Sequence, residues 1–161
     1  NAQFGPEDAS FHRCFAVGCE VGMDLETGSP EPQLVVDACH LNCKRIGIRI
    51  HGRKYFQITS NLLYGENADR NFKDIVLSGR SHRGLIAHNV FQSPARDNLR
   101  PDPPSGRVNI YVEKDVQHIL IADNLHNAKG TAIVVEAGAQ HIVGSGNRAT
   151  NPNTVVPEPF R

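Results

Sequence analysis

Four asparagines end the same short phrase, and this repeat constrains the fold more than any other feature of the chain. The phrases are FQITSN (56–61), GLIAHN (84–89), ILIADN (119–124) and IVGSGN (142–147). A second phrase, in which apolar residues alternate with others, lies upstream of each asparagine. These phrases are GIRIHG (47–52), DIVLSG (74–79), NIYVEK (109–114) and AIVVEA (132–137). Self-similarity at a fixed period of 20–50 residues is typical of stacked architectures.

The same frame continues upstream, where cysteine replaces asparagine. Cys14 and Cys39 occupy the asparagine slot, and VGMDLE (21–26) is the matching strand phrase. Successive slots are separated by 25, 22, 28, 35 and 23 residues. The two longest steps contain the insertions ENADRN (66–71) and PARDNLRPDPPSGR (94–107). Both insertions fall after an asparagine and before the next strand phrase.

The apolar residues within the strand phrases recur at every second position. Period 2 with β-branched residues predicts strands, and no segment has the pattern of a capped helix. A leucine-rich repeat has a similar period but needs leucines at fixed offsets. We therefore predict an all-β parallel β-helix of about six coils, formed by residues 1–161 as a single domain. Residues 94–107 form a long inserted loop in this prediction, and residues 151–161 form a C-terminal tail.

The pattern I-x-x-N-x-h followed by G-I-x-I resembles that of the pectin-lyase-like superfamily over roughly residues 9–150. This superfamily contains polysaccharide lyases, hydrolases, epimerases and phage tailspikes. The resemblance implies a right-handed β-helix and a polysaccharide ligand. The vWiDH-type residues of the lyases are absent, as is the NTD…DD…HG…RIK set of the polygalacturonases, so no catalytic residue can be transferred from the family.

Composition narrows the possible partners. The 17 Lys and Arg residues balance the 17 Asp and Glu residues, which gives no electrostatic reason to expect nucleic acid or an anionic membrane. The chain has no apolar run near 18 residues and no signal peptide, so we predict no membrane partner. We predict no cofactor. Because the chain begins at Asn1 and nothing before Phe11 resembles a capping helix, we expect a fragment whose missing coils, or a partner chain, cover the first strands.

The four cysteines lie in the first third of the chain, at positions 14, 19, 39 and 43. Their spacing matches zinc-binding CxxC pairs poorly. Buried thiols in the core are the first interpretation, a disulfide is the second and a metal site is the third. The redox compartment stays open.

Alternation also separates inward from outward side chains. The side chains expected to point inward are Met23, Leu25, Ile48, Ile50, Ile75, Leu77, Ile110, Val112, Ile133 and Val135. We expect Leu41, Leu63 and Phe91, two residues beyond the slot, to form a second core stack. The asparagines themselves should stack and bond the backbone of neighbouring coils.

The outward residues of the strand phrase form two columns that we predict to bind or cleave a polysaccharide. One column is Asp24, Arg49, Val76, Tyr111 and Val134, and the other is Glu26, His51, Ser78, Glu113 and Glu136. Stacked coils lie about 4.8 Å apart, and the superfamily resemblance places the glycan cleft on this sheet. We predict Glu113, Glu136 and His51 as catalytic residues, and Asp24, Glu26, Arg49 and Tyr111 as substrate-binding residues.

Several reactions fit this predicted face. Two adjacent carboxylates suit a glycoside hydrolase, because repulsion raises one pKa and gives an acid beside a base. A lyase or epimerase would instead need a base such as His51, and Arg49 could neutralise a uronate. The alternative is a solvated strand face with no site at all.

Two other patterns bear on partners. His118 and His141 lie in equivalent positions and should stack as a turn pair, since no third residue completes a metal site. An outward apolar row is formed by Val35, Leu85, Leu120 and Val143, and a row of this kind is usually covered. Either the segment TVVPEPF (154–160) lies over this row or a second subunit does, as in the side-by-side trimers of tailspikes.

These patterns leave two functions open. The first is an extracellular, secreted or virion-tail protein that binds and cleaves a polysaccharide. The second is a non-catalytic structural or adhesion β-helix. The sequence leaves the glycan and the reaction class open.

Overall fold

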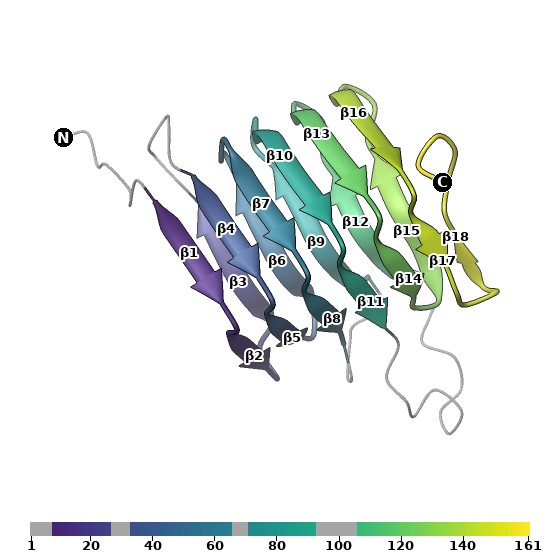
Figure 1. The fold of residues 1–161 in the computed structure, drawn as a ribbon, viewed down its shortest axis with the longest axis horizontal. Coiled ribbons are helices and arrows are strands. Elements are labelled where there is room, and N and C mark those ends of the chain that lie inside the picture. Colours follow the sequence, from purple (N-terminus) through teal and green to yellow (C-terminus); the bar gives the residue numbers. More distant parts are fainter. Residues whose placement is uncertain (1–7, 27–32, 66–70, 93–105) are drawn as a thin grey trace.

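The computed structural model describes residues 8–26, 33–65, 71–92 and 106–161. Within these ranges the protein is all-β, with three parallel sheets of six strands each (Figure 1). Sheet A contains β1 (Ala9–His12), β4 (Leu34–Asp37), β7 (Phe56–Thr59), β10 (His82–Ala87), β13 (Gln117–Ala122) and β16 (Gln140–Ser145). Sheet B contains β2 (Phe15–Val17), β5 (His40–Asn42), β8 (Leu62–Tyr64), β11 (Val90–Gln92), β14 (Leu125–Asn127) and β17 (Arg148–Ala149). Sheet C contains β3 (Val21–Glu26), β6 (Ile46–His51), β9 (Lys73–Ser78), β12 (Val108–Val112), β15 (Gly130–Val135) and β18 (Thr154–Val155).

The chain visits sheets A, B and C in turn and then repeats, so each strand pairs with strands one turn away. This is the predicted parallel β-solenoid. It completes about five turns, slightly fewer than the six coils expected, because the six strands of each sheet enclose five steps. Figure 1 shows β1–β3 at one end of the long axis and β16–β18 at the other. The predicted loop 94–107 lies almost wholly outside the described residues, as does most of the insertion 66–71.

A left-handed residue makes the bend from sheet A to sheet B in every turn. The residues are Arg13, Ala38, Ser60, His88, Asp123 and Gly146, with φ between 53° and 67°. Each directly precedes the repeated Cys or Asn slot. Since the αL conformation costs a non-glycine residue roughly 1 kcal/mol or more, surrounding contacts must hold each bend in place.

The asparagine ladder supplies these contacts. Asn61, Asn89 and Asn124 each donate from Nδ2 to the Oδ1 of the next ladder asparagine at 2.9–3.0 Å. Each Nδ2 also donates to a carbonyl of the preceding turn; Asn89 reaches Ile58 O at 2.9 Å. Each Oδ1 accepts a backbone N–H from the turn before, as when Asn61 N donates to Asn89 Oδ1 at 3.0 Å. The predicted ladder is therefore confirmed, together with its bonds to neighbouring backbone.

Cysteine reproduces part of this pattern where it replaces asparagine. The Cys39 thiol donates to Phe11 O at 3.5 Å, and Phe11 is the register equivalent of the carbonyl residues that Asn61 and Asn89 bond. Cys39 and Cys43 are buried, as predicted, but Cys19 is exposed and Cys14 is half-buried. All four are free thiols.

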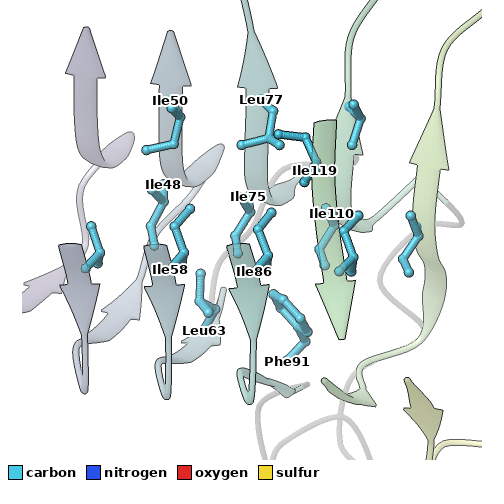
Figure 2. Close-up of a cluster of buried hydrophobic side chains, with 14 of the residues drawn as sticks. Ile48, Ile50, Ile58, Leu63, Ile75, Leu77, Ile86, Phe91, Ile110 and Ile119 are labelled. Atoms are coloured by element: carbon cyan, nitrogen blue, oxygen red, sulfur yellow. The ribbon is translucent and has the colours of Figure 1, made fainter. Parts of the chain in front are cut away.

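Apolar side chains from the three sheets fill the interior of the solenoid. Figure 2 shows a part of this core, where side chains of successive turns stack. In sheet C, Ile48, Ile75 and Ile110 are stacked in register and fully buried. The predicted second stack of Leu41, Leu63 and Phe91 is buried as well. The inward assignment is weaker at the ends of the solenoid. Met23 and Leu25 are only half-buried, and Val135, predicted to be in the core, is 36 % exposed because only the two-residue β18 follows β15 in sheet C.

The C-terminal segment closes one end of the solenoid. β18 pairs with β15, and Val156 and Phe160 are buried. Phe160 O accepts a hydrogen bond from Asn147 Nδ2 at 2.7 Å, so it takes the position that a further ladder residue would occupy. Of the two alternatives for covering the outward apolar row, the one in which residues 154–160 lie over it is wrong: Leu120 and Val143 remain 43 % and 55 % exposed. The second subunit stays a prediction.

Candidate functional site

The predicted polysaccharide face is the outer surface of sheet C. Backbone pairing places Asp24, Arg49, Val76, Tyr111 and Val134 in one column, in the predicted order. The second column begins with Glu26, His51 and Ser78 in register. Glu113 and Glu136 follow directly after the paired ends of β12 and β15. The solenoid thus aligns the candidate side chains along its axis.

Arg49 and Asp24 form a bidentate ion pair on this face. Arg49 Nε donates to Asp24 Oδ1 at 2.7 Å, and Arg49 Nη2 donates to Asp24 Oδ2. The guanidinium of Arg49 lowers the pKa of Asp24. Both side chains are substantially exposed, so solvent screens the pair. To bind a uronate, Arg49 would have to exchange one carboxylate for another.

Tyr111 and Glu136 form the second contact. The Tyr111 hydroxyl donates to Glu136 Oε1, and the backbone N–H of Lys114 donates to Oε2 at 3.0 Å. These bonds lower the pKa of Glu136, with the Tyr111 hydroxyl as the largest cause. Lys73 Nζ lies 4.8 Å from the centroid of the Tyr111 ring. Glu136 is therefore suited to act as an ionised base or nucleophile rather than as a general acid, and one face of Tyr111 is occupied.

His51 lies apart from the two glutamates. Its Nδ1 is 2.9 Å from Ser78 Oγ, and Ser78 is the buried member of the column that separates His51 from Glu113. The ring also packs on Gly79, where a Cβ would lie 2.4 Å from His51 Cε1. The structure thus joins Tyr111 to Glu136 and pairs Arg49 with Asp24. It places Glu113 in the turn next to Glu136, and His51 two turns before Glu113.

A buried polar network that the sequence interpretation did not identify lies under sheet C. Arg107 donates to both oxygens of Asp74, at 3.1 Å from Nε and 2.8 Å from Nη2. Asn109 Nδ2 donates to Asp74 Oδ2 at 2.7 Å, and Asn109 Oδ1 lies 2.9 Å from His126 Nδ1. All four residues are buried. The guanidinium also lies 5.0 Å from the centroid of the Phe72 ring.

Burial and charge act on this network in opposite directions. Burial raises the pKa of Asp74, while the charge of Arg107 and the amide of Asn109 oppose that shift. Burial also lowers the pKa of His126 to about 4, so the imidazole is neutral near pH 7. Its Nδ1–H then donates to Asn109, and its Nε2 has no partner among the described residues. The network therefore connects one ion pair, between Arg107 and Asp74, to the neutral side chains of Asn109 and His126.

A backbone irregularity explains why strict alternation misses Asp74 and Asn109. The pairing of sheet C skips from residue 73 to 75 and from 108 to 110. In the same column, a Cβ on Gly47 would lie 3.1 Å from Leu63 Cδ2 in the core. Two consecutive residues therefore face inward at this corner. His126 was recognisable from its slot: it lies two residues after Asn124, as Phe91 follows Asn89, and its ring stacks on Phe91 with centroids 5.0 Å apart.

His118 and His141 stack as predicted, with ring centroids 4.7 Å apart. Among the described residues, no three His, Cys, Asp or Glu side chains are grouped so that they could hold a metal ion. The described segments also include no helix long and apolar enough to cross a membrane. Comparison with protein-family models, with curated proteins and with solved structures finds no match for this chain.

Proposed function

We propose that this solenoid binds a polysaccharide along the outer face of sheet C and cleaves it with Glu113 and Glu136. The observation that carries the proposal is the register of polar side chains across β3, β6, β9, β12 and β15. A linear ligand lying along the axis would meet a polar or ionisable group in most turns. The resemblance of the sequence repeat to the pectin-lyase-like superfamily supports this function, and the proposal includes an extracellular or virion-tail location.

The roles of the two glutamates follow from their environments. Glu136 is held ionised by the Tyr111 hydroxyl and the Lys114 N–H, which suits the base or nucleophile of a glycoside hydrolase. Glu113, in the neighbouring turn, is then the candidate acid. Arg49 and Asp24 are substrate-binding candidates, because an incoming carboxylate or hydroxyl could exchange with either member of their exposed ion pair.

A non-catalytic binding or structural role is the second candidate. Two specific contacts favour it: Arg49 is already paired with Asp24, and Tyr111 with Glu136. Side chains that satisfy one another in this way also suit a solvated surface, because they leave few groups free for chemistry.

Single substitutions separate the two functions. Wild type, Glu113→Gln and Glu136→Gln would be incubated with a panel of neutral and acidic polysaccharides, with product release and binding measured separately. Glu20→Gln is the control, because it removes the same charge at an exposed position outside both columns; Glu20 pairs with Lys44 at 3.7 Å. Loss of product release of about 100-fold or more in either site variant supports catalysis. An inert wild type that still binds glycan supports the non-catalytic binding role. A wild type that binds no polysaccharide refutes both catalysis and glycan binding and leaves the structural role.

A further inference from the structure

We propose that the outer face of sheet A binds an anionic polysaccharide, one that carries carboxylate or sulfate groups, along a row formed by Tyr55, Arg83, His118 and His141. We call these four residues the corner row, because they line the edge where the chain enters sheet A from sheet C. This site is separate from the sheet C face, and either can be correct without the other.

The backbone presents the corner row in the same way in four successive turns. Its members have φ values of 53°, 58°, 55° and 55°, a conformation that non-glycine residues rarely adopt. Pairing between strands skips these positions: His82 pairs with Gln117, and the next pair is Gly84 with Ile119. The following residue then returns to the interior, as Ile119 does. Two consecutive side chains before it are therefore left outside the core in each turn.

The ionisable groups on the four strands of this face are all basic. The strands β7, β10, β13 and β16 contain no Asp or Glu, but they contain Arg83 and three histidines. Lys54 adds a cation beside His82 through an isolated bridge. Burial lowers the pKa of His82, and the nearby charges of Lys54 and Arg83 lower it further. His82 is therefore neutral near pH 7, and the positive charge comes from Arg83 and Lys54. These two cations, beside four strands that carry no carboxylate, attract an anionic ligand.

The surface is also hollowed where Arg83 lies. An open groove of about 660 Å³ is lined by Asp8, Gln33, Tyr55, Gln57, Arg83, Gly84 and Leu85. Asp8 is the single carboxylate among these described lining residues. The guanidinium of Arg83 lies 5.2 Å from the centroid of the Tyr55 ring and bonds its hydroxyl. An arginine fork of this kind can bind a carboxylate or a sulfate through two parallel hydrogen bonds.

Apolar side chains accompany the corner row on the same face. Leu85, Leu120 and Val143 each lie two residues after the corner-row member of their own strand, and they are paired in register. Leu120 and Val143 are 43 % and 55 % exposed. Sugar rings combine apolar C–H faces with hydroxyl and acidic substituents, so they match an apolar row beside a basic one. Nucleic acid fits less well, because stacking of bases requires free aromatic platforms. The exposed residues of the neighbouring row are aliphatic, and the ring of Tyr55 is already covered by Arg83.

The test uses the full chain and measures its affinity for immobilised alginate and heparin, with dextran as a neutral glycan and single-stranded oligo-dT as a non-glycan polyanion. The site variant is Arg83→Gln, and the control is Arg80→Gln. Arg80 has the same φ of 58° and is also exposed, but it lies outside the corner row, so the two variants remove the same charge from the same backbone conformation. Urea unfolding of each variant verifies that the fold is intact.

We expect Arg83→Gln to weaken binding to alginate or heparin about 10-fold or more, and Arg80→Gln to weaken it less than about 2-fold. A double His118→Gln, His141→Gln variant should weaken binding as well. If Arg83→Gln proves unstable, a fall in wild-type affinity between low and physiological salt tests the electrostatic part independently. Equal effects at Arg83 and Arg80, no binding to either acidic glycan, equal binding to dextran, or tighter binding to oligo-dT would each overturn the inference.

Discussion

Replacing Asn89 by alanine tests how much the asparagine ladder contributes to stability. The Asn89 side chain is fully buried and makes four hydrogen bonds. Its Nδ2 donates to Ile58 O and to Asn124 Oδ1, at 2.9 and 3.0 Å. Its Oδ1 accepts from the backbone N–H and the Nδ2 of Asn61, at 3.0 and 2.9 Å. The alanine variant removes all four bonds without changing the strands themselves.

The size of the effect follows from what the truncation leaves behind. Four buried bonds contribute about 2–6 kcal/mol together, at about 0.5–1.5 kcal/mol each. Asn61 Nδ2 keeps a second acceptor, Val36 O at 3.0 Å. The backbone N–H of Asn61, in contrast, loses its acceptor, Asn89 Oδ1. An orphaned buried donor costs about 1–3 kcal/mol. We therefore expect Asn89→Ala to lower the free energy of unfolding by about 4 kcal/mol, a large part of the 5–15 kcal/mol typical of a domain.

Equilibrium unfolding in urea, followed by circular dichroism, measures this loss. With a slope of about 2 kcal/mol per molar urea, the midpoint should fall by about 2 M. Gln92→Ala, an exposed change in the same turn, is the control and should stay within about 0.5 kcal/mol of wild type. Asn89→Cys should be intermediate, because the Cys39 thiol already bonds the equivalent carbonyl. A loss below about 1 kcal/mol in Asn89→Ala would refute the view that the ladder stabilises the bends.

Three further predictions concern the core. The pKa of His126 is about 4 in the folded protein and about 6.5 in an unfolded chain. Between these pH values the unfolded state therefore binds more protons than the folded state. The free energy of unfolding should fall by about 3 kcal/mol from pH 6.5 to pH 4. His126→Phe should flatten this dependence in urea titrations at several pH values, and an unchanged slope would contradict the assignment. Asp74→Asn should lower the free energy of unfolding by about 3–5 kcal/mol, because it leaves the buried Arg107 without its counter-charge. A double-mutant cycle with Arg107→Gln should show a coupling energy well above about 0.5 kcal/mol. Additive effects of the two substitutions would argue against the ion pair. Gly47→Ala should lower the melting temperature far more than Gly18→Ala. A Cβ at Gly47 would lie 2.5 Å from Asp74 O, whereas at Gly18 only the φ of 73° is unfavourable. Comparable melting temperatures of the two variants would show that the backbone relaxes freely.

Much of the candidate site could be placed from the sequence, and its chemistry could not. The columns of sheet C follow from alternation within each strand and from the repeat between strands, so the neighbours of Arg49 and Tyr111 were predictable. Their contacts depend on rotamers and on side chains of other turns. The bond between Tyr111 and Glu136 therefore emerged only in three dimensions, together with the direction of the pKa shift at Glu136.

The buried network shows the limit of a period-2 interpretation. Asp74 and Asn109 belong to strands that otherwise alternate, and the local irregularity that turns them inward has no marker within either strand phrase. Gly22 and Gly47, at the same position in earlier turns, are small enough for the core to close over them. An acidic residue is tolerated there because Arg107, distant in sequence, supplies the opposite charge.

The sequence by itself determined the solenoid, its ladder and its core, because each turn repeats the same local preferences and a stacked repeat adds only nearest-neighbour contacts. Tertiary structure decided which charges are paired, where the C-terminal segment packs, and that β7, β10, β13 and β16 of sheet A offer a basic, partly apolar surface with no carboxylate on these four strands. These properties depend on residues that the chain brings together from different turns, and on burial, which changes the protonation and pairing of each polar group according to what surrounds it.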